Sequence, residues 1–506
     1  MSSDSLTVPR TLIVFGIIVP LAAILGYVLA SPQDFSSWLW IGLVVCAISL
    51  PFVMRWHHPL LILSWNASIN VFFLPGQPQL WMLFAAASLF LSASERLMTK
   101  QKTFLLAPSV VWPLLTLALV VLITAKLTGG IGLRSLGSGS FGGRRYVQIV
   151  GAIIGFFALV GKRIPIERSK TYVWGFFLSA LTAMMSNLAY FLGPAFYFLY
   201  YLFPPEFALQ QALAEYGMSP LLRLTGVTFA ATSISYFMLA RYGIRGLLDL
   251  TRPWRLIIFA AIFFLGLLGG FRSSLVNFMV LFAIQFFLEG LFRTRLFPAL
   301  VLGLVLSGAA LILWAEKLPL SVQRTLSFLP IHVDSVARAD AESTAEWRLR
   351  MWKIMYPQVP QYLLLGKGCA IDPAEMYMMD EAVQRGLAYD FEATMVRQDY
   401  HSGPLTLLIP FGLPGAIAFL WFVLASLRVL YYNYRYSPPE LKLINTLLFS
   451  LFLMRFIIFM TIYGMFAEDL LLFTGFVGLS ISLNNGVRKP APVTVPAMPE
   501  AALVGA

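Results

Sequence analysis

Apolar stretches long enough to cross a membrane repeat along most of the chain, separated by short polar connections. About 20 apolar residues in a helix span the hydrocarbon core of a bilayer. The pattern predicts transmembrane helices near 11–30, 37–54, 59–74, 79–94, 106–126, 147–161, 172–202, 222–240, 255–269, 272–291, 296–315, 405–431, 442–463 and 468–484. Uninterrupted runs of this length exclude the alternating strands of a membrane β-barrel. We therefore expect an all-α polytopic membrane protein with about 12–14 transmembrane helices.

A single long polar segment interrupts this pattern. It divides the chain into N-terminal helices (1–315), a large loop (316–404), C-terminal helices (405–484) and a tail (485–506). The tail is rich in Pro, Ala and Val and has few groups able to form a core, so it is expected to be disordered and cytoplasmic. We expect the reactive residues to lie in the large loop. We also expect this loop to contain short amphipathic helices.

One such helix is predicted within the large loop at 343–356. Ser343 or Thr344 is the expected N-cap, because a hydroxyl there accepts a hydrogen bond from a free backbone N–H of the first turn. Leu349, Trp352 and Tyr356 recur at helical spacing and define one apolar face. The helix is therefore expected to lie along the mouth of the membrane domain.

Composition and charge support a membrane protein and place the large loop outside the cytoplasm. Charged residues make up only 12% of the chain, against about 25% in soluble domains. The net charge of +12 does not indicate nucleic-acid binding, because the Lys and Arg residues are scattered between apolar segments. With a cytoplasmic N-terminus and a retained first helix, the short cationic connections fall inside, as the positive-inside rule requires. The two cysteines, Cys46 and Cys369, indicate neither a disulfide nor a zinc site.

One predicted outer loop, at 129–146, breaks this charge rule. It carries Arg134, Arg144 and Arg145 among many glycines. Glycine lets backbone amides approach an anion closely, so the loop is a candidate anion-binding segment. A flexible basic connector explains the same composition, and the sequence leaves both interpretations open.

Three polar residues on the predicted outer face form the candidate site. Arg272 begins an apolar segment, Arg348 lies on the predicted loop helix, and His401 comes just before the next apolar segment. Each has an ordinary explanation: a snorkelling side chain, a solvated helix face and a surface histidine. Together they suit displacement of a sugar from a diphosphate, because guanidinium groups neutralise phosphate oxygens and imidazole accepts a proton from a hydroxyl.

Motifs around these residues resemble a known family. They are Phe271-Arg272-Ser273-Ser274; Arg348 to Trp352, followed by Gly366-Lys367-Gly368; and His401-Ser402, followed by Gly412-Leu413-Pro414-Gly415. In this order they resemble the O-antigen ligase and polymerase superfamily of bacterial envelope glycosyltransferases, over roughly 270–430. The chain departs from the usual pattern at Ser402, where asparagine is common, and at Phe271, where a small residue is frequent.

The resemblance implies transfer of a glycan from undecaprenyl diphosphate on the periplasmic face of the bacterial inner membrane, with inversion and without a metal or other cofactor. It implies that Arg272 and Arg348 bind the diphosphate and that His401 is the general base or orients the acceptor. Asp399 either orients His401 or solvates the loop. We add Arg350, Trp352, Arg144 and Arg145 as candidate substrate contacts, since cations and aromatic faces suit phosphates and sugars. Tyr400 and Trp347 are further candidate sugar-stacking residues.

The expected partners are the lipid-linked glycan donor, an acceptor and the surrounding membrane lipids, with no nucleic acid. Lipid A-core as acceptor would make the protein a ligase, and a growing polysaccharide would make it a polymerase; a protein acceptor also stays open. The alternative function is a flippase or exporter of lipid-linked glycans, which would keep its charges along a central path through the first half of the chain. Few acidic residues lie in the predicted spans to couple ion transport.

Overall fold

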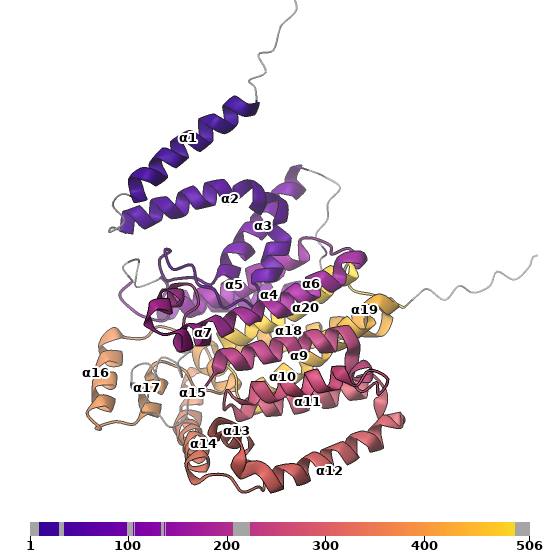
Figure 1. Ribbon diagram of the computed structural model, residues 1–506. Coiled ribbons are helices and arrows are strands. Elements are labelled where there is room, and N and C mark those ends of the chain that lie inside the picture. The colour runs from indigo at the N-terminus through magenta and orange to yellow at the C-terminus, as the bar shows by residue number, and fades with distance from the viewer. Residues whose placement is uncertain are drawn as a thin grey trace, which may run out of the picture.

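The computed structural model describes residues 10–29, 35–98, 105, 107–132, 136, 138–205 and 223–490. Its apolar helices are α1 (Arg10–Leu29), α2 (Phe35–Ser64), α3 (Leu80–Met98), α4 (Pro108–Thr128), α5 (Gly143–Val160), α6 (Ser169–Leu178), α7 (Met184–Leu192), α9 (Thr225–Leu247), α10 (Trp254–Leu267), α11 (Arg272–Leu288), α12 (Leu296–Trp314), α18 (Gly403–Tyr436), α19 (Pro439–Thr461) and α20 (Phe466–Asn484). The large loop folds into α13 (Leu320–Leu326), α14 (Ser335–Met355), α15 (Val359–Tyr362), α16 (Pro373–Gln384) and α17 (Asp390–Val396). Figure 1 shows α14–α17 gathered at one end of the helical bundle.

The helices confirm the predicted fold class. Eight described helical segments are long and apolar enough to cross a membrane, and α10 and α11 are shorter apolar helices. The core of the bundle is formed where α5 and α20 pack together, with fully buried Phe156, Phe473 and Leu479 among its residues. The chain is therefore an all-α polytopic membrane protein. The predicted disordered tail falls mostly at 491–506, outside the described residues.

The loops that connect the helices lie at two opposite ends of the bundle. At one end, the Gly-rich loop before α5 pairs with the large loop, since Phe141 and Ile371 exchange backbone hydrogen bonds of 2.9 and 3.0 Å. At the other end, Tyr434 donates to the carbonyl of Leu288 at 2.8 Å, so the ends of α18 and α11 lie together. The Gly-rich loop and the large loop therefore share one end, which we call the loop end.

The structure corrects two predicted spans near the N-terminus. We expected separate helices at 37–54 and 59–74, but α2 runs continuously through Pro51 and Pro59 and ends at Ser64. The rest of the predicted second span is not helical: Trp65 is buried there, and its ring fills space left by the absent side chains of Gly155 and Gly475. Hydropathy measures how apolar a segment is, not whether its backbone is helical, so the sequence pattern could not separate the two cases.

A second correction concerns the predicted long span at 172–202. The chain there forms α6 and α7, with one 3-10 turn between them (Ser179–Ala183) and another after them (Pro194–Tyr201). Gly193, with a φ of 89°, ends α7. Thr182 accepts a hydrogen bond from the backbone of Ser68 at 2.9 Å, so the interrupted helix also supports the non-helical segment that follows α2.

The Gly366-Lys367-Gly368 motif fastens the large loop to a kink in α18. The kink lies at Gly412, which has a φ of 63° and a ψ of −164°. Lys367 N donates to the carbonyl of Ile409 at 2.7 Å, and Gly368 N donates to that of Pro410 at 2.9 Å. These carbonyls have lost their helical partners at the kink, and the loop satisfies them instead. The motif therefore has a structural function that the family resemblance does not specify.

Replacement of Gly412 by alanine is expected to destabilise the protein by about 1–3 kcal/mol, since its conformation belongs almost only to glycine. The added Cβ would also lie 2.7 Å from the carbonyl oxygen of Leu363. The melting temperature of the purified protein in detergent measures the effect. Gly303→Ala in α12 is the control, because its Cβ would meet nothing within 4 Å. Equal melting temperatures for the two variants would contradict the account of the kink.

Candidate active site

The loop helix α14 begins earlier than the sequence predicts. Its N-cap is Asp334, whose side chain accepts a hydrogen bond from the backbone N–H of Val336 at 2.8 Å. The predicted caps were therefore wrong: Ser343 and Thr344 lie inside the helix, and both hydroxyls donate to the carbonyl of Asp340. Serine and threonine make such bonds in helix interiors as well as at caps, so their presence alone does not locate a helix start.

The face of α14 that packs on the bundle also differs from the predicted one. Leu349 and Tyr356 are 61% and 51% exposed, whereas Met351 and Met355 are buried. Arg348 lies on the same face as these methionines, at the spacing of one and two helical turns. The helix therefore presents Arg348 toward the bundle and not toward solvent.

His401 is held by contacts on three sides. Trp352 Nε1 donates to the carbonyl of Tyr400 at 2.8 Å, which fixes the backbone just before the histidine. His401 itself has a φ of 47°, an uncommon conformation for a residue with a side chain. Its ring lies between Trp347 and Tyr463, with ring centroids 5.1 and 5.4 Å away. The imidazole is thus oriented by its surroundings before any substrate binds.

Polar atoms around this imidazole are buried without partners. Among the described residues, His401 Nδ1, Asp399 Oδ1 and Arg348 Nε make no hydrogen bond within the protein. The other histidine nitrogen, Nε2, lies 3.8 Å from Asp399 Oδ2. Burial lowers the pKa of His401; the Asp399 carboxylate opposes this shift, and the charge of Arg348 adds to it. Buried polar groups normally pair, so this arrangement favours a site that receives a polar ligand.

Tyr463 was not predicted as a site residue, yet it joins the two central groups. The guanidinium carbon of Arg348 lies 5.7 Å from the centre of its ring, within cation–π range. The turn that carries Tyr463 connects α19 to α20 and is braced by an ion pair between Arg455 and buried Asp469. Asp469 also accepts the backbone N–H of Met465 at 2.9 Å. An acidic residue such as Asp469 at the edge of an apolar span is the kind of sequence signal that could have pointed to this turn.

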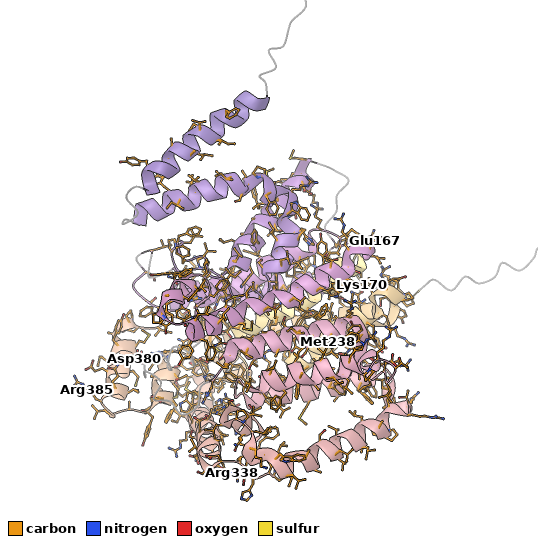
Figure 2. The ribbon with its side chains drawn as sticks, in the orientation of Figure 1. Glu167, Lys170, Met238, Arg338, Asp380 and Arg385 are labelled. Carbon is orange, nitrogen blue, oxygen red and sulfur yellow. The ribbon has the colours of Figure 1, made fainter. Side chains whose placement is uncertain are left out.

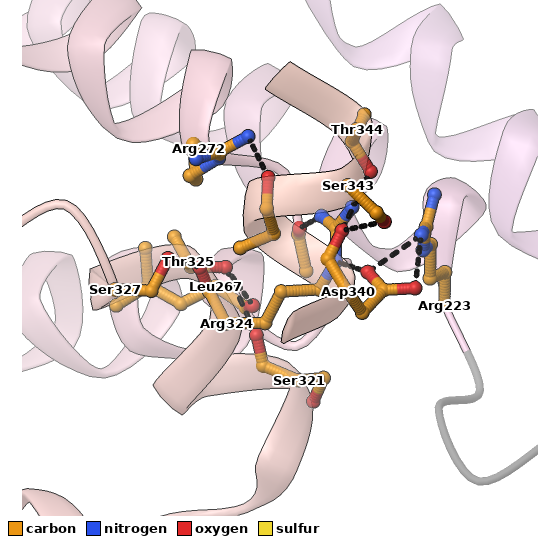
Figure 3. Close-up of polar contacts among 12 residues, drawn as sticks. Arg223, Leu267, Arg272, Ser321, Arg324, Thr325, Ser327, Asp340, Ser343 and Thr344 are labelled. Carbon is orange, nitrogen blue, oxygen red and sulfur yellow. Dashed lines mark hydrogen bonds and ion pairs between the residues drawn. The ribbon is translucent and has the colours of Figure 1, made fainter. Parts of the chain in front are cut away.

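Arg272 lies at the first position of α11, at the same end of the bundle. It donates to the carbonyl of Ala341 in α14 at 2.6 Å (Figure 3). Burial lowers the pKa of Arg348, and the positive charges of Arg272 and Arg324 lower it further, so the three guanidinium groups are electrostatic neighbours. The structure therefore brings the three principal predicted residues to one place, with Arg272 beside α14 and His401 beside Tyr463.

Two other predicted residues of α14 have different surroundings. Arg350 is exposed and pairs with Glu346 at 3.3 Å. Trp352 packs in the cluster around Tyr400 and uses its indole N–H on the backbone there. Arg350 thus pairs with Glu346 on the exposed side of the helix. Trp352 holds the backbone that precedes His401.

The described basic residues of the Gly-rich loop, Arg144 and Arg145, also have different surroundings. Arg144 is exposed, and Arg145 donates to the carbonyl of Arg397, near the end of the large loop. Arg134 lies outside the described residues. Arg145 also lines a small cavity with Cys369 and Gln398, behind the segment that leads to His401. In the part of the chain that the structure describes, no three His, Cys, Asp or Glu side chains form a possible metal site.

The comparison with known families agrees with this geometry. Residues 222–420 match the family described as O-Antigen ligase. No curated protein matches the sequence. The matched segment contains Arg272, Arg348 and His401, while Tyr463 lies beyond it. This match confirms the resemblance inferred from the motifs: residues 222–420 are similar to the O-antigen ligase family.

Proposed function

We propose that the loop end of this protein transfers a glycan from undecaprenyl diphosphate to an acceptor hydroxyl on the periplasmic face of the bacterial inner membrane. The observation that carries the proposal is the stacking of Arg348 and His401 on Tyr463, with buried polar atoms that no protein group satisfies. A cation and a neutral imidazole, both desolvated and fixed in orientation, suit a reaction in which negative charge develops on a leaving diphosphate.

The proposed chemistry is a direct displacement. The acceptor oxygen forms a bond to the anomeric carbon while the bond from that carbon to the diphosphate oxygen breaks, which inverts the configuration. His401 takes the proton of the acceptor hydroxyl, and the electron pair of the broken bond stays on the diphosphate. Arg272 and Arg348 offset the added negative charge there. The lipid keeps the leaving group in the membrane.

Asp399→Asn is expected to shift the acidic limb of the pH–rate profile. A general base works when unprotonated, so the rate rises as the pH rises through the pKa of His401 and is flat above it. The Asp399 charge raises that pKa against the effect of burial. Its removal should therefore move the acidic limb to lower pH and lower the plateau rate, since a weaker base remains. Profiles of kcat/KM test this.

Asp390→Asn is the control for this variant, because Asp390 is an exposed carboxylate in the first turn of α17. The profile of the control should match that of the unmodified protein. A limb that moves to higher pH in Asp399→Asn would show that Asp399 does not act on His401 as described.

The test of the function itself is transfer by the purified protein in detergent. The donor is a glycan on undecaprenyl diphosphate, and separate reactions offer lipid A-core or a second donor molecule as the acceptor. Modified lipid A-core identifies a ligase, and chain growth alone identifies a polymerase. No transfer to either acceptor, together with movement of the labelled lipid across vesicles, would replace this proposal with the exporter function.

A further inference from the structure

A second polar cluster adjoins Arg272 at the loop end, and the proposed reaction does not yet use it. Arg223, just before α9, lies 3.0 and 3.3 Å from the two carboxylate oxygens of Asp340 in α14. Arg324 of α13 pairs with the same carboxylate (Figure 3). Arg272 donates to the carbonyl of Ala341, the next residue along α14. Two arginines therefore contact one carboxylate, and a third is bound to the next residue of the same helix.

The arginines in this cluster differ in accessibility. The Arg324 side chain is 4% exposed and also donates to the carbonyl of Gly270 and, at 3.1 Å, to the hydroxyl of Thr344. It joins the start of α11 to α14 and has a structural position. The Arg223 side chain is 27% exposed and its hydrogen bonds go to Asp340, which is itself 34% exposed. Arg223 can therefore exchange this partner for another anion without leaving its place.

We propose that Arg223 is a further phosphate-binding residue and that Asp340 occupies its guanidinium until a diphosphate takes the place of the carboxylate. The donor as the source of that diphosphate rests on the proposed function. The substrate class is a diphosphate that reaches from Arg272 to Arg223.

Charge and geometry support this exchange. Carboxylates and phosphates both accept paired hydrogen bonds from a guanidinium, and a phosphate brings more charge. Burial alone would raise the pKa of Asp340, but its contacts with Arg324 and Arg223 outweigh this and hold the pKa below the usual range. Asp340 is thus ionised at neutral pH and competes with an incoming anion. Burial and the neighbouring charge of Arg324 lower the pKa of Arg223, as expected where positive charges are in excess.

Calorimetric binding of inorganic pyrophosphate to the full-length protein in detergent tests the proposal. Arg223→Ala should bind pyrophosphate about tenfold or more weakly, the usual effect of one charged hydrogen-bonding group. Asp340→Asn should bind it several-fold more tightly, because the competing charge is removed while the shape is kept. A purely structural Asp340 predicts the opposite sign, since loosening α14 would weaken binding.

The controls are Arg385→Ala and Glu381→Gln, an exposed pair on α16 at 2.6 Å; Figure 2 shows Arg385 at the outer edge of the molecule. Both should bind pyrophosphate as the unmodified protein does. Melting temperatures of all variants establish that they are folded. No measurable pyrophosphate binding, weaker binding by Asp340→Asn, or unchanged binding by Arg223→Ala would each overturn the proposal.

A second arm uses nanodiscs that contain undecaprenyl diphosphate. If the site serves a lipid-linked donor, Arg223→Ala should weaken binding in both arms; an effect on free pyrophosphate alone would overturn the assignment to the donor. Glycan transfer is measured separately. Absence of transfer by the unmodified protein, with the two binding effects present, would refute the proposed function and leave the anion site standing.

Discussion

Replacement of His401 by alanine is expected to lower glycan transfer by about 10²–10⁴-fold, the contribution typical of a positioned general base. The protein should remain folded, because Trp352 still holds the neighbouring backbone through the carbonyl of Tyr400. Initial rates with saturating donor measure the loss. His401→Gln should be no better, since an amide occupies similar space but does not take up the proton.

His332→Ala is the matched control for this experiment. His332 lies in the same loop but is exposed and outside the stacked group. Its replacement should change the rate by less than about twofold, as is usual for surface positions. Full transfer by His401→Ala would refute the assignment of the base, and equal losses in both variants would indicate a general disturbance of the loop.

Replacement of Arg348 by alanine is expected to lower transfer by about 10²–10³-fold, the cost of removing one group that stabilises transition-state charge. It should also move the acidic limb of the remaining activity to higher pH, because the Arg348 charge lowers the pKa of His401. Arg348→Lys should recover only part of the rate, since an ammonium has neither the planar fork nor the same stacking on Tyr463.

Arg338→Ala tests whether any cation on α14 has this effect. Arg338 is exposed on the same helix and donates to the carbonyl of Ile331 at 3.0 Å; Figure 2 shows it at the lower edge of the molecule. Its rate and its pH profile should match those of the unmodified protein. An unshifted acidic limb in Arg348→Ala would mean that the two side chains are not electrostatically coupled.

The sequence predicted the class of fold because membrane helices depend on length and hydropathy alone. It failed where the backbone departs from a regular helix. The predicted span at 59–74 is no longer helical from Trp65 onward, and Gly193 ends a helix inside an apolar run. Both features arise from packing against distant segments, which a local average of hydropathy does not contain.

The site was also partly predictable. Arg272, Arg348 and His401 were selected by their combination on the predicted outer face and by the motifs around them, since each alone has an ordinary explanation. The orientation of α14 was not predictable, since Leu349 and Met351 are both apolar and only tertiary contacts decide which is buried. Tyr463 was missed because an aromatic residue at the end of a span needs no functional explanation.

The pairing of Arg223 with Asp340 was also beyond the sequence. These residues are separated by the whole of α9 to α13, and each is unremarkable among its neighbours in the chain. Only the folded loop brings them together beside Arg272. Long-range polar contacts of this kind depend on how the loop packs on the bundle. Hydrophobic periodicity carries no information about that packing.

The most direct test of the proposed transfer is the anomeric configuration of the bond that the purified protein forms, measured by NMR together with the amount of undecaprenyl diphosphate released. Direct displacement assisted by His401 predicts one lipid diphosphate released for each new bond and a configuration opposite to that of the donor. A retained configuration would require a covalent glycosyl intermediate and would contradict the assigned mechanism. Release of lipid diphosphate without bond formation would contradict the transfer itself.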